Sequence, residues 1–131
     1  NVLFTYELQR RCVQAKASLI STACHPGYAG TNLQMVGPAM SGSSITQRIM
    51  TLGNRLVAQS AAMGALPTLY AATEPSIRGG EYIGPGGWFE MKGYPTHIRS
   101  SARSHDRVSA ERLWRVSEEL TQVHYKALAL A

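Results

Sequence analysis

Residues 21 to 34 read STACHPGYAGTNLQ, and the fold assignment depends on this stretch. A β-prone run with little charge stops at a Pro-Gly pair. Pro26 lacks an N–H, and Gly27 allows backbone to approach a ligand closely. Hydroxyl and amide donors follow at Thr31 and Asn32. Since ligands of open α/β sheets bind outside the carboxyl ends of the strands, the stretch fits either the edge of a ligand site or a plain tight turn.

The segments on the N-terminal side of this stretch predict half of an α/β repeat. Phe4, Leu8 and Cys12 recur at four-residue spacing, with most charged side chains elsewhere on the helical wheel. This spacing predicts an amphipathic helix over residues 1 to 16. The short uncharged run over residues 18 to 24 predicts a strand that is covered on both faces, as in parallel sheets.

The rest of the chain predicts more helix than strand. The stretch 84 to 95 is rich in glycine and reads as loop. Pro67 is expected to bend its helix or to mark the first turn. The predicted elements are a loop over 25 to 43, helices over 44 to 59 and 60 to 73, a strand over 81 to 84, and a helix over 105 to 123 with Ala110, Leu113, Val116, Leu120 and Val123 on one face.

Two strands cannot bury the apolar faces of roughly four helices, because a parallel pair needs neighbouring strands and covering layers. The chain is therefore expected to be part of a larger α/β sheet. It opens on Asn1 with apolar residues following at once and no helix-start signal, so we expect it to begin inside a helix.

Composition excludes several classes of protein. The 131 residues fit one domain or a piece of one, and 44% apolar with 16% charged residues is ordinary for a globular protein. No apolar run approaches the length of a membrane span. The net charge of +5 is scattered with few aromatic neighbours, which favours a solvated surface over a nucleic-acid site. Arg99, Arg103 and Arg107 are expected to share one helical face.

Cysteine usage indicates the compartment. Cys12 and Cys24 lie on apolar segments without a CxxC partner, so we expect buried free thiols and a cytoplasmic protein. The first eleven residues do not read as a secretory signal peptide.

Motifs for nucleotide, hydrolase or metal chemistry are not found. No GxGxxG or GxSxG occurs, and residues 37 to 44 have P-loop glycine spacing without the lysine. The histidines are far apart in sequence, so no metal site and no catalytic residue are predicted. His25 is interpreted as a positioned loop residue.

Four stretches together resemble one family. HPGYAGTN (25 to 32) is similar to the Pro-Gly…Thr segment of short-chain dehydrogenases/reductases, and NVLFTYELQRR (1 to 11) to the helix that follows their Tyr-x-x-x-Lys motif. GALPTLYAATEPSIRGGEYIGP (64 to 85) and RSSARSHDRVSAERLWRVSEEL (99 to 120) resemble the C-terminal third of the retinol-dehydrogenase-like branch. The stretches occur in the family's order and cover nearly the whole chain.

The resemblance implies the C-terminal part of a Rossmann-like doubly wound parallel sheet that lacks the N-terminal nucleotide-binding strands. It implies NAD or NADP as cofactor and reversible hydride transfer to or from an alcohol or carbonyl compound. When the family's cofactor-binding positions are carried over to this sequence, the resemblance places Pro26, Gly27, Tyr28 and Ala29 along the nicotinamide ring and carboxamide. Thr31 would donate a hydrogen bond near the carboxamide or diphosphate.

The same resemblance implies a mobile substrate lid over residues 33 to 56. Within it, four apolar side chains would suit an apolar alcohol or carbonyl substrate, although this spacing also occurs in ordinary cores: Met35, Met40, Ile45 and Ile49.

The family's catalytic groups have no counterpart in these residues. The glycine-rich motif, the serine and the Tyr-Lys pair lie upstream in the family, and Tyr6 and Lys16 have the wrong order and spacing to replace them. We therefore expect no turnover by this chain alone, and a partner that is either the N-terminal half or a second copy. Two alternatives stay open: a non-enzymatic remnant or interaction module exposing the apolar face of residues 2 to 13, and one chain of a split dehydrogenase.

Overall fold

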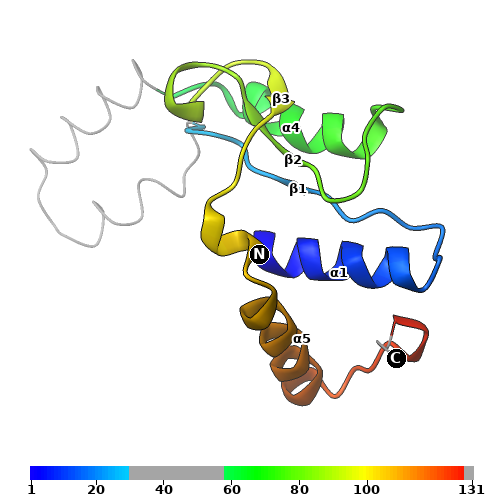
Figure 1. Cartoon of the computed structure of the whole chain (residues 1–131). Helices are drawn as coiled ribbons and strands as arrows, with labels where there is room; N and C mark the ends of the chain where they lie inside the picture. The colour runs from blue at the N-terminus through cyan, green and yellow to red at the C-terminus, as the bar shows by residue number, and fades with distance from the viewer. Residues whose placement is uncertain (30–57, 129–131) are drawn as a thin grey trace, which may run out of the picture. The chain divides into compact units, whose positions relative to one another are not determined.

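The computed structural model describes residues 1 to 29 and 58 to 128 (Figure 1). The chain forms two compact units. The first comprises Asn1–Ala23, Glu74–Tyr82 and His97–Ala131, and the second comprises Cys24–Thr73 and Ile83–Thr96.

A small mixed sheet runs through the described residues in the order β1 (Ala23–Cys24), β2 (Tyr82–Pro85), β3 (Pro95–His97). β1 and β2 are parallel, since the N–H groups of residues 23 and 25 donate to the carbonyls of residues 81 and 83, each at 3.0 Å. β2 and β3 are antiparallel, since the N–H groups of residues 86 and 98 donate to the carbonyls of residues 94 and 82, each at 2.9 Å. The chain is thus α/β, with a sheet that is not purely parallel.

Both sheet predictions need correction. The strand predicted over 18 to 24 is limited to Ala23–Cys24, because the Ser21 N–H donates to the Gln9 side chain at 2.7 Å. Leu19 and Ile20 are more than half exposed, so the run is not covered on both faces. β3 begins at the end of the stretch predicted as loop, and the described residues therefore contain three strands instead of two.

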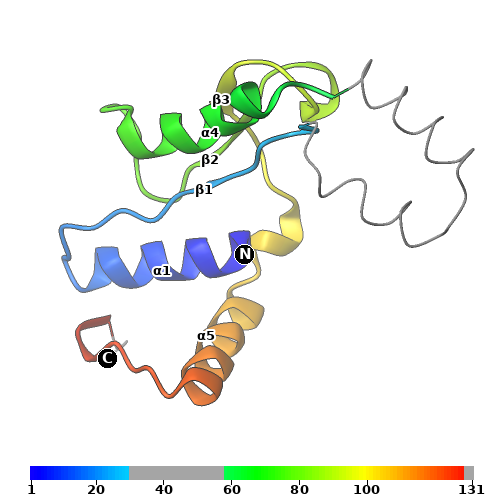
Figure 2. The same ribbon diagram turned by 180° about the vertical axis from the view of Figure 1, so that it is seen from behind.

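The first unit is built on α1 (Val2–Gln14) and α5 (Arg107–Thr121), which lie beside each other in both views (Figures 1 and 2). The Phe4 and Trp114 rings stack with centroids 5.2 Å apart, and Ala110 and Trp114 are the buried residues of α5. The apolar face predicted for the helix over 105 to 123 is wrong in its C-terminal half, because Val116 and Leu120 are exposed, as is Val123 beyond the end of α5. The aromatic side chain buries far more area than the aliphatic ones and sets the face that packs inward.

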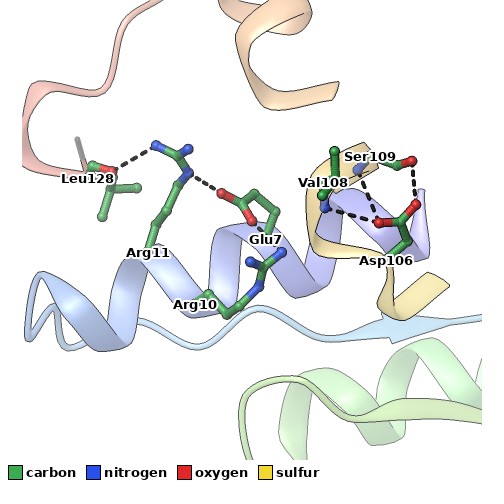
Figure 3. Close-up of polar contacts among 7 residues, drawn as sticks. All are labelled: Glu7, Arg10, Arg11, Asp106, Val108, Ser109 and Leu128. Atoms are coloured by element: carbon green, nitrogen blue, oxygen red, sulfur yellow. Dashed lines mark hydrogen bonds and ion pairs between the residues drawn. The ribbon is translucent and has the colours of Figure 1, made fainter. Parts of the chain in front are cut away.

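Two charged residues of α1 are buried, contrary to the predicted polar face. Glu7 is fully buried and Arg11 is 7% exposed. Arg11 Nε donates to Glu7 Oε1 at 2.6 Å (Figure 3). The Arg11 guanidinium also lies 4.4 Å from the centre of the Trp114 ring. The apolar face expected to be exposed over residues 2 to 13 is partly buried instead, with Cys12 fully buried and only Val13 exposed.

The start of α5 is set by Asp106. Its carboxylate accepts from the N–H groups of Val108 at 3.0 Å and Ser109 at 3.3 Å, and from the Ser109 hydroxyl at 2.6 Å (Figure 3). This cap separates α5 from the short helix Ala102–His105. The predicted single helical face for Arg99, Arg103 and Arg107 is therefore wrong.

The second unit contains α4 (Ala61–Thr73), with Pro67 in its interior and not in its first turn. Gly64 allows the close approach of the loop after β1, since a Cβ there would lie 2.7 Å from that of Ala29. Cys12 is a buried free thiol as predicted, but Cys24 is partly exposed, with its sulfur 3.4 Å from the Thr68 hydroxyl oxygen. In the described part of the chain, no helix is both long and apolar enough to span a bilayer.

Candidate functional site

Residues 25 to 29, named here the Pro-Gly loop, begin where β1 ends. This is the carboxyl end of a strand in a parallel pair, the usual place for ligands in α/β sheets. Gly27 has a φ of +66°, and a Cβ there would lie 2.5 Å from the Met91 carbonyl oxygen and 2.6 Å from Pro85 Cγ. Glycine is the residue that satisfies both the backbone angle and the space.

His25 holds the turn from inside the Pro-Gly loop. Its Nδ1 accepts from the Gly27 N–H at 3.1 Å, and its Nε2 lies 3.3 Å from Glu90 Oε2. Because Nδ1 is an acceptor, the ring proton is on Nε2 and is donated toward the carboxylate. The imidazole thus links the turn to the segment after β2 without needing a positive charge.

Gln59 fixes the Pro-Gly loop from the other side. Its side chain donates from Nε2 to the Pro26 carbonyl at 2.6 Å and accepts at Oε1 from the Gly93 N–H at 3.1 Å. Its backbone N–H donates to the Tyr28 carbonyl at 2.9 Å, and a parallel bridge pairs it with Ala29. Gln59 is 8% exposed, so its amide is nearly shielded from water. Hydrogen bonds are stronger in such a low-dielectric environment, and each one therefore constrains the loop strongly.

The hairpin after β2 completes the support. The Tyr28 N–H donates to the Met91 carbonyl at 2.6 Å, and Gly86 and Gly87 donate to the carbonyls of Tyr94 and Lys92. The Pro-Gly loop is therefore held by its own strand and by two segments that are distant in sequence, the residues just before α4 and this hairpin.

Four of the residues predicted to bind the cofactor lie together in this loop: Pro26, Gly27, Tyr28 and Ala29. The predicted donor Thr31 and the predicted substrate residues Met35, Met40, Ile45 and Ile49 lie outside the described residues, as does nearly all of the helix predicted over 44 to 59. Gln59 had been assigned to the end of that helix. Nothing local in the sequence marks it as a support, because its partners come from two other segments, the Pro-Gly loop and the hairpin after β2.

The described residues contain no group of three or more His, Cys, Asp or Glu side chains that could hold a metal. The backbone groups of Pro26, Gly27 and Tyr28 bond to both side chains and backbone, so the arrangement presents a fixed surface and not a nucleophile. Such a surface can orient a planar polar ligand by shape and by main-chain contacts.

A scan against protein-family models matches none. A search of curated proteins finds similarity to the "Short chain dehydrogenase/reductase dpchH" of Colletotrichum higginsianum (strain IMI 349063), with 30% identity over 118 residues, which is 89% of this chain and 27% of that protein. This similarity supports a distant relationship to the short-chain dehydrogenases/reductases.

Among solved structures, the chain is similar to the crystal structure of an uncharacterized protein from Mycobacterium paratuberculosis. The identity is 33%, the TM-score is 0.66, and the alignment covers 95% of this chain and 36% of the other. The chain thus spans between about a quarter and just over a third of the length of these two proteins. An origin among oxidoreductases follows from the curated relative, and no comparison names the retinol-dehydrogenase-like branch.

Proposed function

We propose that this chain supplies the nicotinamide-side loop and the substrate lid of an NAD(P)-dependent short-chain dehydrogenase/reductase of the retinol-dehydrogenase-like branch, and that it forms the C-terminal part of a Rossmann-like sheet. The reaction is reversible hydride transfer between the cofactor and an apolar alcohol or carbonyl compound. The observation that carries the proposal is the fixed Pro-Gly loop at the carboxyl end of β1, together with the similarity to a short-chain dehydrogenase/reductase.

The loop fits the nicotinamide half of such a cofactor for a physical reason. A carboxamide and a flat ring are recognised by backbone groups that do not move when the ligand arrives, since prior ordering lowers the entropy lost on binding. Gln59 and His25 supply that ordering by fixing Pro26 and Gly27. The bound cofactor supplies the hydride chemistry, and the residues of this chain would hold its ring against the substrate.

The lid part of the proposal concerns Met35, Met40, Ile45 and Ile49. Thioether and branched aliphatic side chains fit an apolar substrate because they fill irregular space and need no hydrogen-bond partners. The proton-transfer groups of the family have no counterpart among the 131 residues, so we expect them from another part of a longer polypeptide or from a second chain.

A titration with half-cofactors tests the loop directly. Nicotinamide mononucleotide is added to the isotope-labelled chain, and the backbone amide signals of Gly27, Tyr28 and Ala29 are followed by NMR. We expect these signals to shift with nicotinamide mononucleotide and to stay in place with adenosine monophosphate, which lacks the ring.

A matched pair of variants supplies the control. Gly27→Val removes the space at the loop and should abolish the shifts, whereas Gly80→Val changes a left-handed glycine of the first unit and should leave them intact. Equal responses to the two mononucleotides would reject a nicotinamide site in this loop. An intact mass of the natural polypeptide above that of 131 residues would support the proposed longer enzyme.

A further inference from the structure

Two cavities lie in the first unit, and no residue of the Pro-Gly loop lines them. One has a volume of about 370 Å³ and the other about 460 Å³. They share Tyr6, Gly80 and His105 as lining residues, so they are two parts of one hollow around the stacked Tyr6 and His105 rings, whose centroids are 4.7 Å apart.

A chain of hydrogen bonds forms part of this hollow. Ser100 Oγ lies 2.8 Å from the Tyr6 hydroxyl, 3.0 Å from His105 Nε2 and 2.7 Å from Ser104 Oγ. Ser104 Oγ also lies 2.6 Å from the Ser101 carbonyl, which can only accept. The side chains of Tyr6, Ser100, Ser104 and His105 therefore form one connected network.

Ser104 Oγ donates to Ser100 Oγ, while either hydroxyl can be the donor in the contact between Ser100 and Tyr6. In the contact between Ser100 and His105, the tautomer of the imidazole sets which atom donates. The cluster forms a hydrogen-bonded wall of the hollow.

The charged side chains around the hollow are mostly positive. Among the described residues, it is lined by Arg10, Arg99 and Arg107 against one carboxylate, that of Glu81. Glu81 is already engaged, with Oε1 3.6 Å from His97 Nδ1 and Oε2 accepting from the Arg78 N–H at 2.8 Å. Arg10 is paired with Glu7. The guanidinium groups of Arg99 and Arg107 make no ion pair or hydrogen bond within the described part of the chain.

We propose that this hollow binds a small molecule through a phosphate group. A guanidinium offers parallel N–H donors that match two oxygens of a phosphate, and two such groups without a protein carboxylate leave positive charge for a ligand to neutralise. Gly80, Gln9 and Ser104 complete a polar lining beside them. This site is separate from the proposed cofactor loop and does not depend on the proposed function.

Inorganic phosphate is the probe for the first experiment. The ring proton signals of His105 are followed by NMR during a titration at constant ionic strength, with sodium chloride as the balancing salt. We expect a saturable shift with phosphate and with sulfate, which has the same tetrahedral oxygens, and none with chloride alone. A shift that follows ionic strength regardless of the anion would overturn the proposal.

Arginine variants locate the site. Arg107→Gln and Arg99→Gln should each weaken phosphate binding by about tenfold, the loss expected for one charge-assisted hydrogen bond. Arg112→Gln removes the same charge from an exposed position of α5 that does not line the hollow, and should leave binding within about twofold. Equal weakening by the variants at residues 107 and 112 would show diffuse attraction only and would reject a site.

Discussion

The side-chain amide of Gln59 holds the carbonyl of Pro26 at 2.6 Å from Nε2. The same amide accepts from the Gly93 N–H, so one buried residue joins the Pro-Gly loop to the hairpin that follows β2. The Pro26 carbonyl and the Gly93 N–H therefore both have a hydrogen-bond partner without water. The shape of the loop is thereby fixed by a residue outside it.

Gln59→Ala should destabilise the second unit by about 1 to 3 kcal/mol, because it leaves a carbonyl and an N–H without their partner in a nearly buried place. Amide exchange at Gly93 and the free energy of unfolding in urea measure the effect. Gln14→Ala, at an exposed end of α1, is the control and should be close to neutral. Similar losses for both variants would contradict the bridging role.

Gly27→Ala should cost more than Gly80→Ala. Both glycines have a positive φ, at +66° and +83°, and each substitution therefore carries about 1 to 2 kcal/mol of backbone strain. At Gly27 the new methyl group also meets the Met91 carbonyl oxygen at 2.5 Å, whereas at Gly80 the nearest neighbouring atom is Gln9 Cγ at 3.7 Å. Urea unfolding of both variants measures the difference in their free energies of unfolding. Equal losses of stability would show that the loop rearranges around the new methyl group without cost.

Arg11→Ala should destabilise the first unit by about 3 to 5 kcal/mol. It removes the hydrogen-bond partner of the fully buried Glu7 carboxylate and the cation over Trp114. Arg10→Ala should cost less than Arg11→Ala, because the Arg10 side chain is 33% exposed and Arg11 remains as a partner of Glu7.

A double variant separates the penalty of an orphaned charge from the value of the pair. Glu7→Leu combined with Arg11→Met should recover most of the stability lost in Arg11→Ala, because apolar side chains of similar size often replace buried ion pairs without loss. Thermal unfolding compares the three proteins. A double variant as unstable as Arg11→Ala would mean that the pair itself contributes most of the stabilisation.

The helix cap of α5 should give stability a pH dependence. Hydrogen bonds from the Ser109 side chain and backbone lower the pKa of Asp106 from its ordinary value of 3.8. Because the folded pKa is the lower one, the stabilisation is complete above about 4 and is lost as the pH falls through the folded pKa. Asp106→Asn retains an acceptor and should remove this acid-side loss, as measured by helix content and urea unfolding between about pH 6 and about pH 2.

The sequence predicted the approximate places of the described helices better than the faces they bury. The four-residue spacing of Phe4, Leu8 and Cys12 indicates a helix, but it cannot show that Glu7 and Arg11 lie inward. Their burial depends on Trp114, which is about a hundred residues away in the chain. A pattern of local hydrophobicity carries no information on such a partner.

The sheet was harder to predict for a related reason. Glycine-rich residues before β3 read as loop, although glycines at 86, 87 and 93 are what permit the tight return that pairs β3 with β2. Pro26 to Ala29 could be named as a candidate site from the strand-end pattern. Gln59 could not, because a support that joins three distant segments is a property of the tertiary structure alone.

The position of Trp114 also gives the protein an internal optical reporter. The chain has two tryptophans, Trp114 at 2% exposure in the first unit and Trp88 at 74% in the second. The enclosed indole should emit at shorter wavelength and resist collisional quenching by iodide, whereas the exposed one should emit at longer wavelength and be quenched readily. Fluorescence recorded with and without quencher should therefore follow the unfolding of each unit separately in the unlabelled protein.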